Sequence, residues 1–122
     1  MIIGIGTDLI EVVRVEKACE NKRFLVKNFT EKEQELFTTD SQKVAGNFAV
    51  KESVAKAFGT GFRHFSLHEI EVLRDTLGKP YVNLYGNALE VAKQLGINQI
   101  HVSITNTKEY ASAFVIAEKI DD

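Results

Sequence analysis

The chain has 122 residues, a length that predicts one domain and leaves little room for a second core. Hydrophobic residues make up 44% of the sequence and charged residues 26%, which is typical of a soluble globular protein. The formal net charge of −2 gives no general reason to expect nucleic acid or an anionic membrane as a partner.

Cysteine content and apolar runs exclude further classes. The single cysteine, Cys19, excludes an intrachain disulfide and a cysteine-rich metal site. The sequence begins with Met-Ile-Ile-Gly and shows no signal-peptide pattern. None of its apolar runs approaches the roughly 20 residues of a membrane helix. We therefore expect a cytoplasmic protein.

The first predicted element is a buried strand over residues 2–10, interrupted by Gly4 and Gly6. Glycine within a strand often marks a bulge or the close approach of a backbone or a ligand. Asp8 stands in the same apolar run, where an unpaired carboxylate would be costly. We expect it to cap the following helix, over about residues 12–21, or to pair with a lysine or a metal ion.

A basic segment over residues 14–28 follows, in a chain that is slightly acidic overall. It indicates a solvated helix face or a surface that docks an acidic protein. Its cationic residues lie around Phe24 and are Arg14, Lys17, Lys22, Arg23 and Lys27. Beyond it, Thr30 and Glu33 have the spacing of a capping box and predict a helix to about residue 38. We assign that motif no chemistry.

The central predicted helix covers residues 41–58, with Asp40 and Ser41 as candidate caps and Gly59 as a left-handed stop. The Gly46-Asn47 pair weakens this helix locally and indicates close packing. The Gly-Thr-Gly sequence that begins at Gly59 follows a helix instead of preceding one. It is therefore no phosphate-binding loop.

Phe48, Glu52 and Lys56 are spaced i, i+4 and i+8 on this helix and share one face. The simplest interpretation is an ordinary glutamate–lysine pair in solvent. The alternative is that a carboxylate above a lysine holds a divalent metal ion and a phosphate together. Because oxygen ligands such as Asp8 and Glu52 suit Mg²⁺ and lysine suits phosphate, phosphoryl or phospho-group transfer is the expected reaction class.

The second half of the sequence predicts a hairpin, a helix and a second hairpin. The first hairpin covers residues 68–75 and 80–85. The helix covers residues 87–95, with Asn87 as cap and Gly96 as stop. The second hairpin covers residues 100–105 and 110–117. Alternation places Glu71 on the exposed side of the first strand. The three histidines lack the spacing of a zinc site.

Four stretches carry a more specific signal. They are Gly-Ile-Gly-Thr-Asp-Leu-Ile-Glu-Val-Val-Arg over 4–14, Gly-Asn-Phe-Ala-Val-Lys-Glu-Ser-Val-Ala-Lys-Ala-Phe-Gly-Thr-Gly over 46–61, Leu-Gly-Lys-Pro-Tyr over 77–81 and His-Val-Ser-Ile-Thr-Asn-Thr-Lys-Glu-Tyr-Ala over 101–111. In order and spacing they resemble the holo-[acyl-carrier-protein] synthases, which are small 4′-phosphopantetheinyl transferases. The resemblance covers essentially the whole chain. It implies one domain over residues 1–122 and an α+β fold, with an antiparallel sheet packed against helices.

The resemblance also implies a reaction. The phosphopantetheine arm of coenzyme A would pass to a serine of apo acyl carrier protein, for fatty acid biosynthesis, leaving adenosine 3′,5′-bisphosphate. Asp8 and Glu52 would hold Mg²⁺ against the coenzyme A pyrophosphate. Lys56 would contact the phosphates and could protonate the departing oxygen, while Glu52 or a metal-bound water would take the serine proton.

Two further sets of residues follow from the resemblance, together with a homotrimer that has its active sites between subunits. The coenzyme A set is Lys56, Gly59, Lys79, Pro80, Ser103, Thr105 and Asn106. The carrier-protein set is Arg14, Lys22, Arg23, Phe24 and Lys27, in agreement with the charge argument above.

The sequence departs from the family at two positions and leaves two other functions open. Asn47 and Asn106 stand where many members have arginine and histidine, which removes charge that could pair with a coenzyme A phosphate. One alternative is a module that binds an acidic carrier protein or coenzyme A without turnover. The other is a Mg²⁺-dependent phosphohydrolase. The intact Asp8, Glu52 and Lys56 argue against the first, and the basic segment argues against the second.

Overall fold

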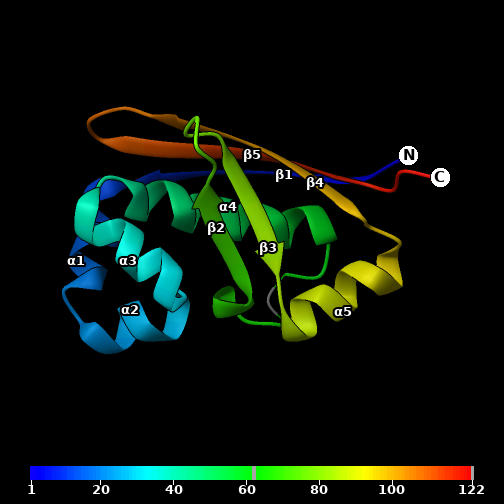
Figure 1. Ribbon diagram of the computed structural model, residues 1–122, viewed down its shortest axis with the longest axis horizontal. Coiled ribbons are helices and arrows are strands. Elements are labelled where there is room, and N and C mark those ends of the chain that lie inside the picture. The colour runs from blue at the N-terminus through cyan, green and yellow to red at the C-terminus, as the bar shows by residue number, and fades with distance from the viewer. Residues whose placement is uncertain (62, 122) are drawn as a thin grey trace.

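The structure is a computed structural model that describes residues 1–61 and 63–121. Its strands fall into two sheets, and its first four helices follow one another between β1 and β2 (Figure 1). The elements are β1 (Ile2–Glu11), α1 (Val12–Cys19), α2 (Lys22–Asn28), α3 (Glu31–Thr39), α4 (Lys43–Phe58), the 3-10 helix η1 (Leu67–Glu69), β2 (Ile70–Arg74), β3 (Pro80–Leu84), α5 (Gly86–Leu95), β4 (Gln99–Asn106) and β5 (Tyr110–Glu118). None of the helices in these residues has the length and apolar character that crossing a membrane requires. The interpretation as a single domain stays a prediction.

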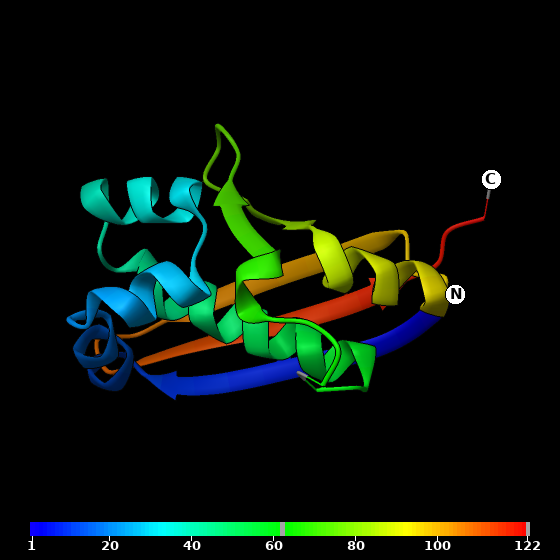
Figure 2. The same ribbon diagram turned by 90° about the horizontal axis from the view of Figure 1, so that it is seen from below.

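An antiparallel sheet in the order β1-β5-β4 forms one layer of the molecule, and the helices lie on one face of it (Figures 1 and 2). Side chains alternate between the two faces, as strands require. On β5, Ala113 and Val115 are buried against the helices, while Phe114 points outward in register with Thr7 and Ser103. The predicted α+β fold with an antiparallel sheet against helices is therefore confirmed.

The central helix α4 packs directly on β1, and two glycines make this possible. A Cβ atom on Gly4 would lie 1.9 Å from the carbonyl oxygen of Ala57, and one on Gly6 would lie 1.9 Å from that of Ser53. No real side chain tolerates such distances, so these strand positions accept only glycine. The predicted close backbone approach is confirmed, and it brings the next inward-facing residue, Asp8, against α4.

Helix α4 is buried on almost every side. Twelve of its sixteen residues are buried. Beyond Lys43 in its first turn, the residues that retain exposure are Phe48, Glu52 and Lys56, so the predicted shared face is the accessible edge of the helix. Gly59 ends the helix with a φ of 76°, as predicted.

The second sheet is the β2–β3 hairpin, and its polar residues correct the sequence analysis. Glu71 is 3% exposed and not on a solvated side. It is buried because Thr30 Oγ1, Asn83 Nδ2 and Tyr85 Oη donate hydrogen bonds to its carboxylate. Alternation along a strand distinguishes two faces but cannot show that both are covered.

Helix starts were predicted less well than helix ends. The capping box of Thr30 and Glu33 is present, and so is the left-handed stop at Gly96. Asp40 and Ser41 do not cap α4, which begins after Gln42 without a side-chain cap. Asp40 instead accepts a hydrogen bond from the Gln42 amide and pairs with Lys43.

The start of α5 is also different from the prediction. Its N-cap is Tyr85 and not Asn87. The backbone amide of Asn87 donates to Glu69 Oε2 at 2.7 Å, so a carboxylate from η1 satisfies the free amide of this helix start.

Candidate functional site

Asp8, Glu52 and Lys56 meet where β1 crosses α4. Lys56 Nζ donates to Asp8 Oδ1 at 3.1 Å and to the Thr7 carbonyl at 2.9 Å. The interpretation of Asp8 as a helix cap is wrong, because the N-cap of α1 is Glu11 and no side chain caps this helix. The lysine that we considered as a partner for Asp8 is confirmed.

The two carboxylates carry more negative charge than Lys56 balances. Asp8 Oδ2 is buried and has no hydrogen-bond partner among the described residues. The carboxylate of Glu52 also has no hydrogen-bond partner within this part of the chain. Burial raises the pKa of Glu52, and the negative charge of Asp8 raises it further, against the opposing effect of Lys56. An unpaired buried oxygen beside a second carboxylate is an environment that stabilises a cation.

The donor set suits one type of metal ion. No group of three or more histidine, cysteine, aspartate or glutamate side chains with metal-binding geometry occurs in the described residues. Mg²⁺ commonly takes one or two carboxylates and completes its shell with water and substrate phosphates. Asp8 and Glu52 therefore fit Mg²⁺ and do not form a closed site of protein ligands alone.

An apolar pocket of about 400 Å³ opens beside the carboxylates. Phe24 and Phe48 stack in its wall with ring centroids 6.1 Å apart, and Arg14 lies at the same pocket. Phe48 precedes Glu52 by one helical turn, and Ile10 of the pocket stands two residues after Asp8 on the same face of β1. The pocket and the carboxylates are thus continuous along both β1 and α4.

The predicted docking residues on α1 and α2 form a cationic surface. The four basic residues of this set are exposed, and none of them makes an ion pair within the described residues. They are Arg14, Lys22, Arg23 and Lys27. Their charges are free to meet a negative partner.

The structure adds two cations that the sequence analysis did not assign. Pro80 and Asn106, both predicted at coenzyme A, line a pocket of about 340 Å³ together with Lys43 and Arg74. These residues come from β3, β4, α4 and β2, so only the tertiary fold brings them together. In the sequence, the one local sign that Arg74 belongs to this pocket was its position next to the Leu-Gly-Lys-Pro turn.

Of the other predicted coenzyme A residues, Lys79 directly precedes Pro80 but does not line this pocket, and the rest lie elsewhere in the chain. Ser103 and Thr105 are exposed on the outer face of the sheet, in register with Phe114 and Ser112. Lys56 and Gly59 lie at the end of α4, and none of these residues lines the pocket of Pro80 and Asn106. A single chain does not gather the whole set at one pocket.

Asn47 cannot take the role of the arginine that it replaces. Its side chain has no exposed surface and donates to Glu33 Oε2 at 2.9 Å and to the Val72 carbonyl at 2.8 Å. We expected this position to affect the binding of coenzyme A phosphates. Direct contact between Asn47 and a phosphate is excluded, because the side chain is buried. Asn106 is exposed at its pocket, so the expectation for that residue stays a prediction.

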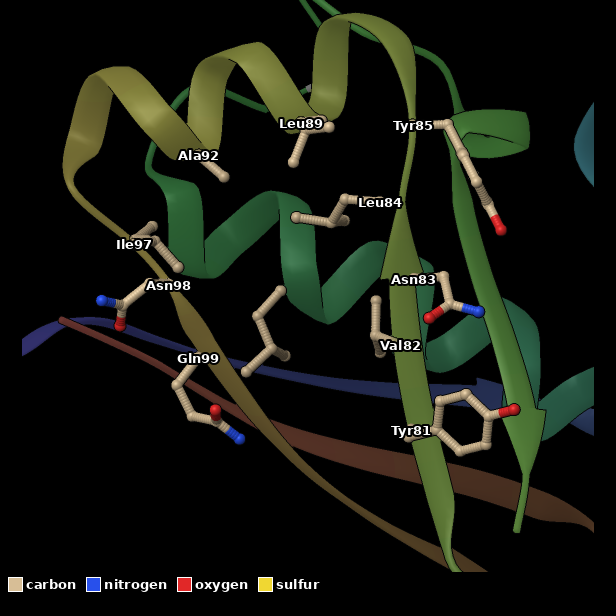
Figure 3. A pocket seen from close by; sticks show the side chains of 11 residues that line it. Tyr81, Val82, Asn83, Leu84, Tyr85, Leu89, Ala92, Ile97, Asn98 and Gln99 are labelled. Carbon is tan, nitrogen blue, oxygen red and sulfur yellow. The ribbon is translucent and has the colours of Figure 1, made fainter. Parts of the chain in front are cut away.

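A larger pocket of about 500 Å³ lies between β3, α5 and β4 (Figure 3). Leu84, Leu89 and Ile97 point into it, and none of the described residues that line it is charged. It contains no predicted site residue. A pocket without cations is poorly suited to a pyrophosphate, so we do not place coenzyme A there.

Comparison with known proteins decides the family. A model of the 4′-phosphopantetheinyl transferase superfamily matches residues 4–115. The chain belongs to this superfamily. A curated holo-[acyl-carrier-protein] synthase from Lachnoclostridium phytofermentans is 65% identical over 120 residues, which is 98% of each chain. The resemblance found in the sequence is thereby confirmed, and the chain is an enzyme of this transferase superfamily.

Solved structures of the superfamily share the fold. Acyl carrier protein synthase from Plasmodium yoelii with ADP bound is 36% identical, with a TM-score of 0.88 over 99% of this chain and 98% of its own. Holo-(acyl-carrier-protein) synthase from Bacillus anthracis in complex with CoA (3′,5′-ADP) is 35% identical, with a TM-score of 0.81 over 98% and 99%. The transferase fold expected from the resemblance is confirmed.

Proposed function

We propose that this transferase moves the 4′-phosphopantetheine arm of coenzyme A to a serine hydroxyl of apo acyl carrier protein, with Mg²⁺, and releases adenosine 3′,5′-bisphosphate. The observation that carries the proposal is the unpaired carboxylate oxygen of Asp8 beside Glu52 and Lys56, next to an apolar pocket and a cationic surface. The names of the relatives support the two substrates, since one is a holo-[acyl-carrier-protein] synthase and another is in complex with CoA.

Asp8 and Glu52 would hold the metal ion. When bound, Mg²⁺ supplies Lewis acidity and neutralises charge on the pyrophosphate. Asp8 is the more rigid of the two, because Lys56 fixes one of its oxygens and leaves the other free. Glu52 lies on the accessible edge of α4, where it can turn toward a ligand.

Lys56 and Glu52 would move the protons. The serine oxygen attacks the β-phosphorus of coenzyme A, and the bond from that phosphorus to the bridging oxygen breaks. Lys56 uses two of its three N–H donors on Asp8 and Thr7, so one remains for a phosphate oxygen or for the leaving oxygen. Glu52, whose pKa is raised, is a candidate for the group that takes the serine proton, and a water molecule is the alternative.

Coenzyme A would bind between subunits of a homotrimer. Its nucleotide end would bind at the pocket of Pro80 and Asn106, which Arg74 and the Lys43–Asp40 ion pair also line. Asp8 and Glu52 belong to a different surface of the same chain. Neighbouring chains can bring the two surfaces together. The outer sheet face supports this assembly, because it exposes apolar side chains that need a cover. These are Ile5 at 59%, Leu9 at 65% and Phe114 at 43% exposure.

The carrier protein would dock on α1 and α2. An acidic helix suits the unpaired charges of Arg14, Lys22, Arg23 and Lys27, and an apolar side chain of that helix suits the pocket of Phe24 and Phe48. Because this pocket adjoins Asp8 and Glu52, docking there would place the acceptor serine near the reacting phosphate. The cytoplasmic location and the role in fatty acid biosynthesis stay predictions.

Intact mass spectrometry of apo acyl carrier protein tests the function. We expect incubation with this protein, coenzyme A and Mg²⁺ to add one phosphopantetheine unit, and EDTA to prevent the addition. An unchanged carrier with intact coenzyme A would favour the binding module instead. Cleavage of coenzyme A without an adduct would favour the phosphohydrolase.

A further inference from the structure

A buried polar cluster lies on a different face of α4 from Glu52. We define it as the Glu33 anchor, formed by Glu33 of α3 with Asn47 and Lys51 of α4, and none of the three has exposed surface. Lys51 Nζ donates to Glu33 Oε1 at 2.7 Å and to the Leu67 carbonyl at 2.9 Å. Its third acceptor is the carbonyl of Ile70, so all three ammonium hydrogens have partners.

Glu33 is satisfied on both carboxylate oxygens. Its Oε1 also accepts from the Thr30 amide at 3.1 Å. Its Oε2 accepts from Asn47 Nδ2 at 2.9 Å and from the Val72 amide at 3.2 Å. The anchor therefore joins α3, α4 and β2 through directional hydrogen bonds.

The same hydrogen-bond network continues into the β2–β3 hairpin. Thr30 Oγ1 donates to Glu71 Oε2 at 2.6 Å, and Glu71 Oε1 accepts from Asn83 at 3.1 Å and from Tyr85 at 3.0 Å. In Figure 3 the side chains of Asn83 on β3 and of Tyr85, which follows β3, point toward β2. One hydrogen-bond network thus connects α4 to the β2–β3 hairpin, which has Lys79-Pro80 at its turn.

Burial alone does not fix how α4 is turned about its own axis. Twelve of its sixteen positions are buried, so the helix has no broad polar face whose exposure to water would set its orientation. Hydrogen bonds do depend on direction, and Lys51 directly precedes Glu52. A buried ion pair is often no more stable than apolar residues of the same volume, so stability is a weak reason for its presence.

We propose that the Glu33 anchor positions the reacting groups of the transferase. By fixing the rotation of α4, it holds Glu52 and Lys56 opposite Asp8. This inference rests on the proposed function of those three side chains. Glu33, Asn47 and Lys51 are positioning residues, because they are buried away from any substrate.

Three variants test the anchor. Asn47→Leu keeps the size of the side chain and removes two hydrogen bonds from α4. The double variant Glu33→Gln with Lys51→Met removes both charges of the ion pair together, so that neither partner is left buried without the other. Tyr85→Phe is the matched control, since it removes one bond of the same network, from the residue that follows β3 to Glu71 of β2, and none on α4.

Mn²⁺ binding in the presence of coenzyme A is the main readout, measured from the electron paramagnetic resonance signal of the free ion. We expect both α4 variants to stay folded but to bind Mn²⁺ about tenfold more weakly, with about tenfold lower kcat, as for residues that orient metal ligands. The KM for carrier protein should not change. Tyr85→Phe should match the wild type in all three quantities.

Wild-type Mn²⁺ affinity in either folded α4 variant would overturn the inference. Loss of folding in both would also count against it, because the anchor would then be a requirement of the fold and not of the site. Absence of Mn²⁺ binding in the wild-type protein is a different result, which would overturn the proposed function itself.

Discussion

At the scale of single residues, the carboxylate of Glu52 is held where it is costly to keep ionised. Its raised pKa means that the folded chain binds this proton more tightly than the unfolded chain does. The free energy of unfolding therefore falls as pH rises from the ordinary value of 4.5 through the raised one, and it stays lowered at pH 7. Residues kept for function often carry such a cost.

We expect Glu52→Gln to lose most Mg²⁺-dependent transfer because a neutral amide is a poor ligand for Mg²⁺. Its melting temperature at pH 7 should equal or exceed that of the wild type, since the cost of the charge is gone. Thermal denaturation between pH 5 and pH 8 and a transfer assay check both parts. Glu90→Gln on α5 is the exposed control. Full activity in Glu52→Gln would remove this residue from the metal site.

Sequence reasoning found some of these residues because their surroundings were visible in the chain. Asp8 stood out as a carboxylate in an apolar run, and Glu52 and Lys56 stood out by their spacing. The ion pair of Glu33 with Lys51 was not predicted, because the capping box already accounted for a glutamate at position 33. Lys51 looked like any helical lysine, since its acceptors on Leu67 and Ile70 reach it only in the folded chain.

At the scale of elements, the contact of β1 with α4 sets the distance between the two carboxylates. We expect Gly6→Ala to destabilise the protein by roughly 3 kcal/mol or more, because its new Cβ would overlap the Ser53 carbonyl. Gly59→Ala is the comparison: that site is open, and only its left-handed backbone costs about 1 kcal/mol. Urea denaturation measures both. Equal losses would contradict the close packing.

The cationic pair α1 and α2 leads to a prediction about substrates. Arg14→Ala should raise the KM for carrier protein several-fold and leave the KM for coenzyme A nearly unchanged, with a smaller effect at high salt. Steady-state kinetics with each substrate varied in turn would show this. Lys93→Ala, an exposed lysine on α5, serves as the control. Equal effects of Arg14→Ala on both substrates would argue against docking at this surface.

Elements were predicted well where their patterns are local. The five strands and the ends of α4 and α5 follow from alternation, spacing and left-handed glycines. The starts of α4 and α5 did not, because the groups that serve their amides include Glu69, which is distant in sequence. The pocket of Pro80 and Asn106 joins four elements, and no local pattern contains it.

At the scale of the whole molecule, the outer face of the sheet remains to be covered. We expect the wild-type protein to sediment as a trimer and Phe114→Lys to sediment as a monomer with little transfer activity. A charge at the centre of that face would have to be buried unpaired. Leu95→Lys, an equally polar change on α5, should stay trimeric. Full activity in a monomeric Phe114→Lys protein would contradict sites between subunits.

The accessible edge of α4 has a consequence for mutational tolerance. Twelve positions of this helix are core, and Phe48, Glu52 and Lys56 face the site. The remaining residue, Lys43, lines the proposed nucleotide pocket, so every position of α4 has a structural or functional role. A saturation library over the helix would therefore lose folding at most positions and function at the remaining four. Variation among working enzymes of this kind should collect on α5 and on the exposed face of α3, where neither constraint applies.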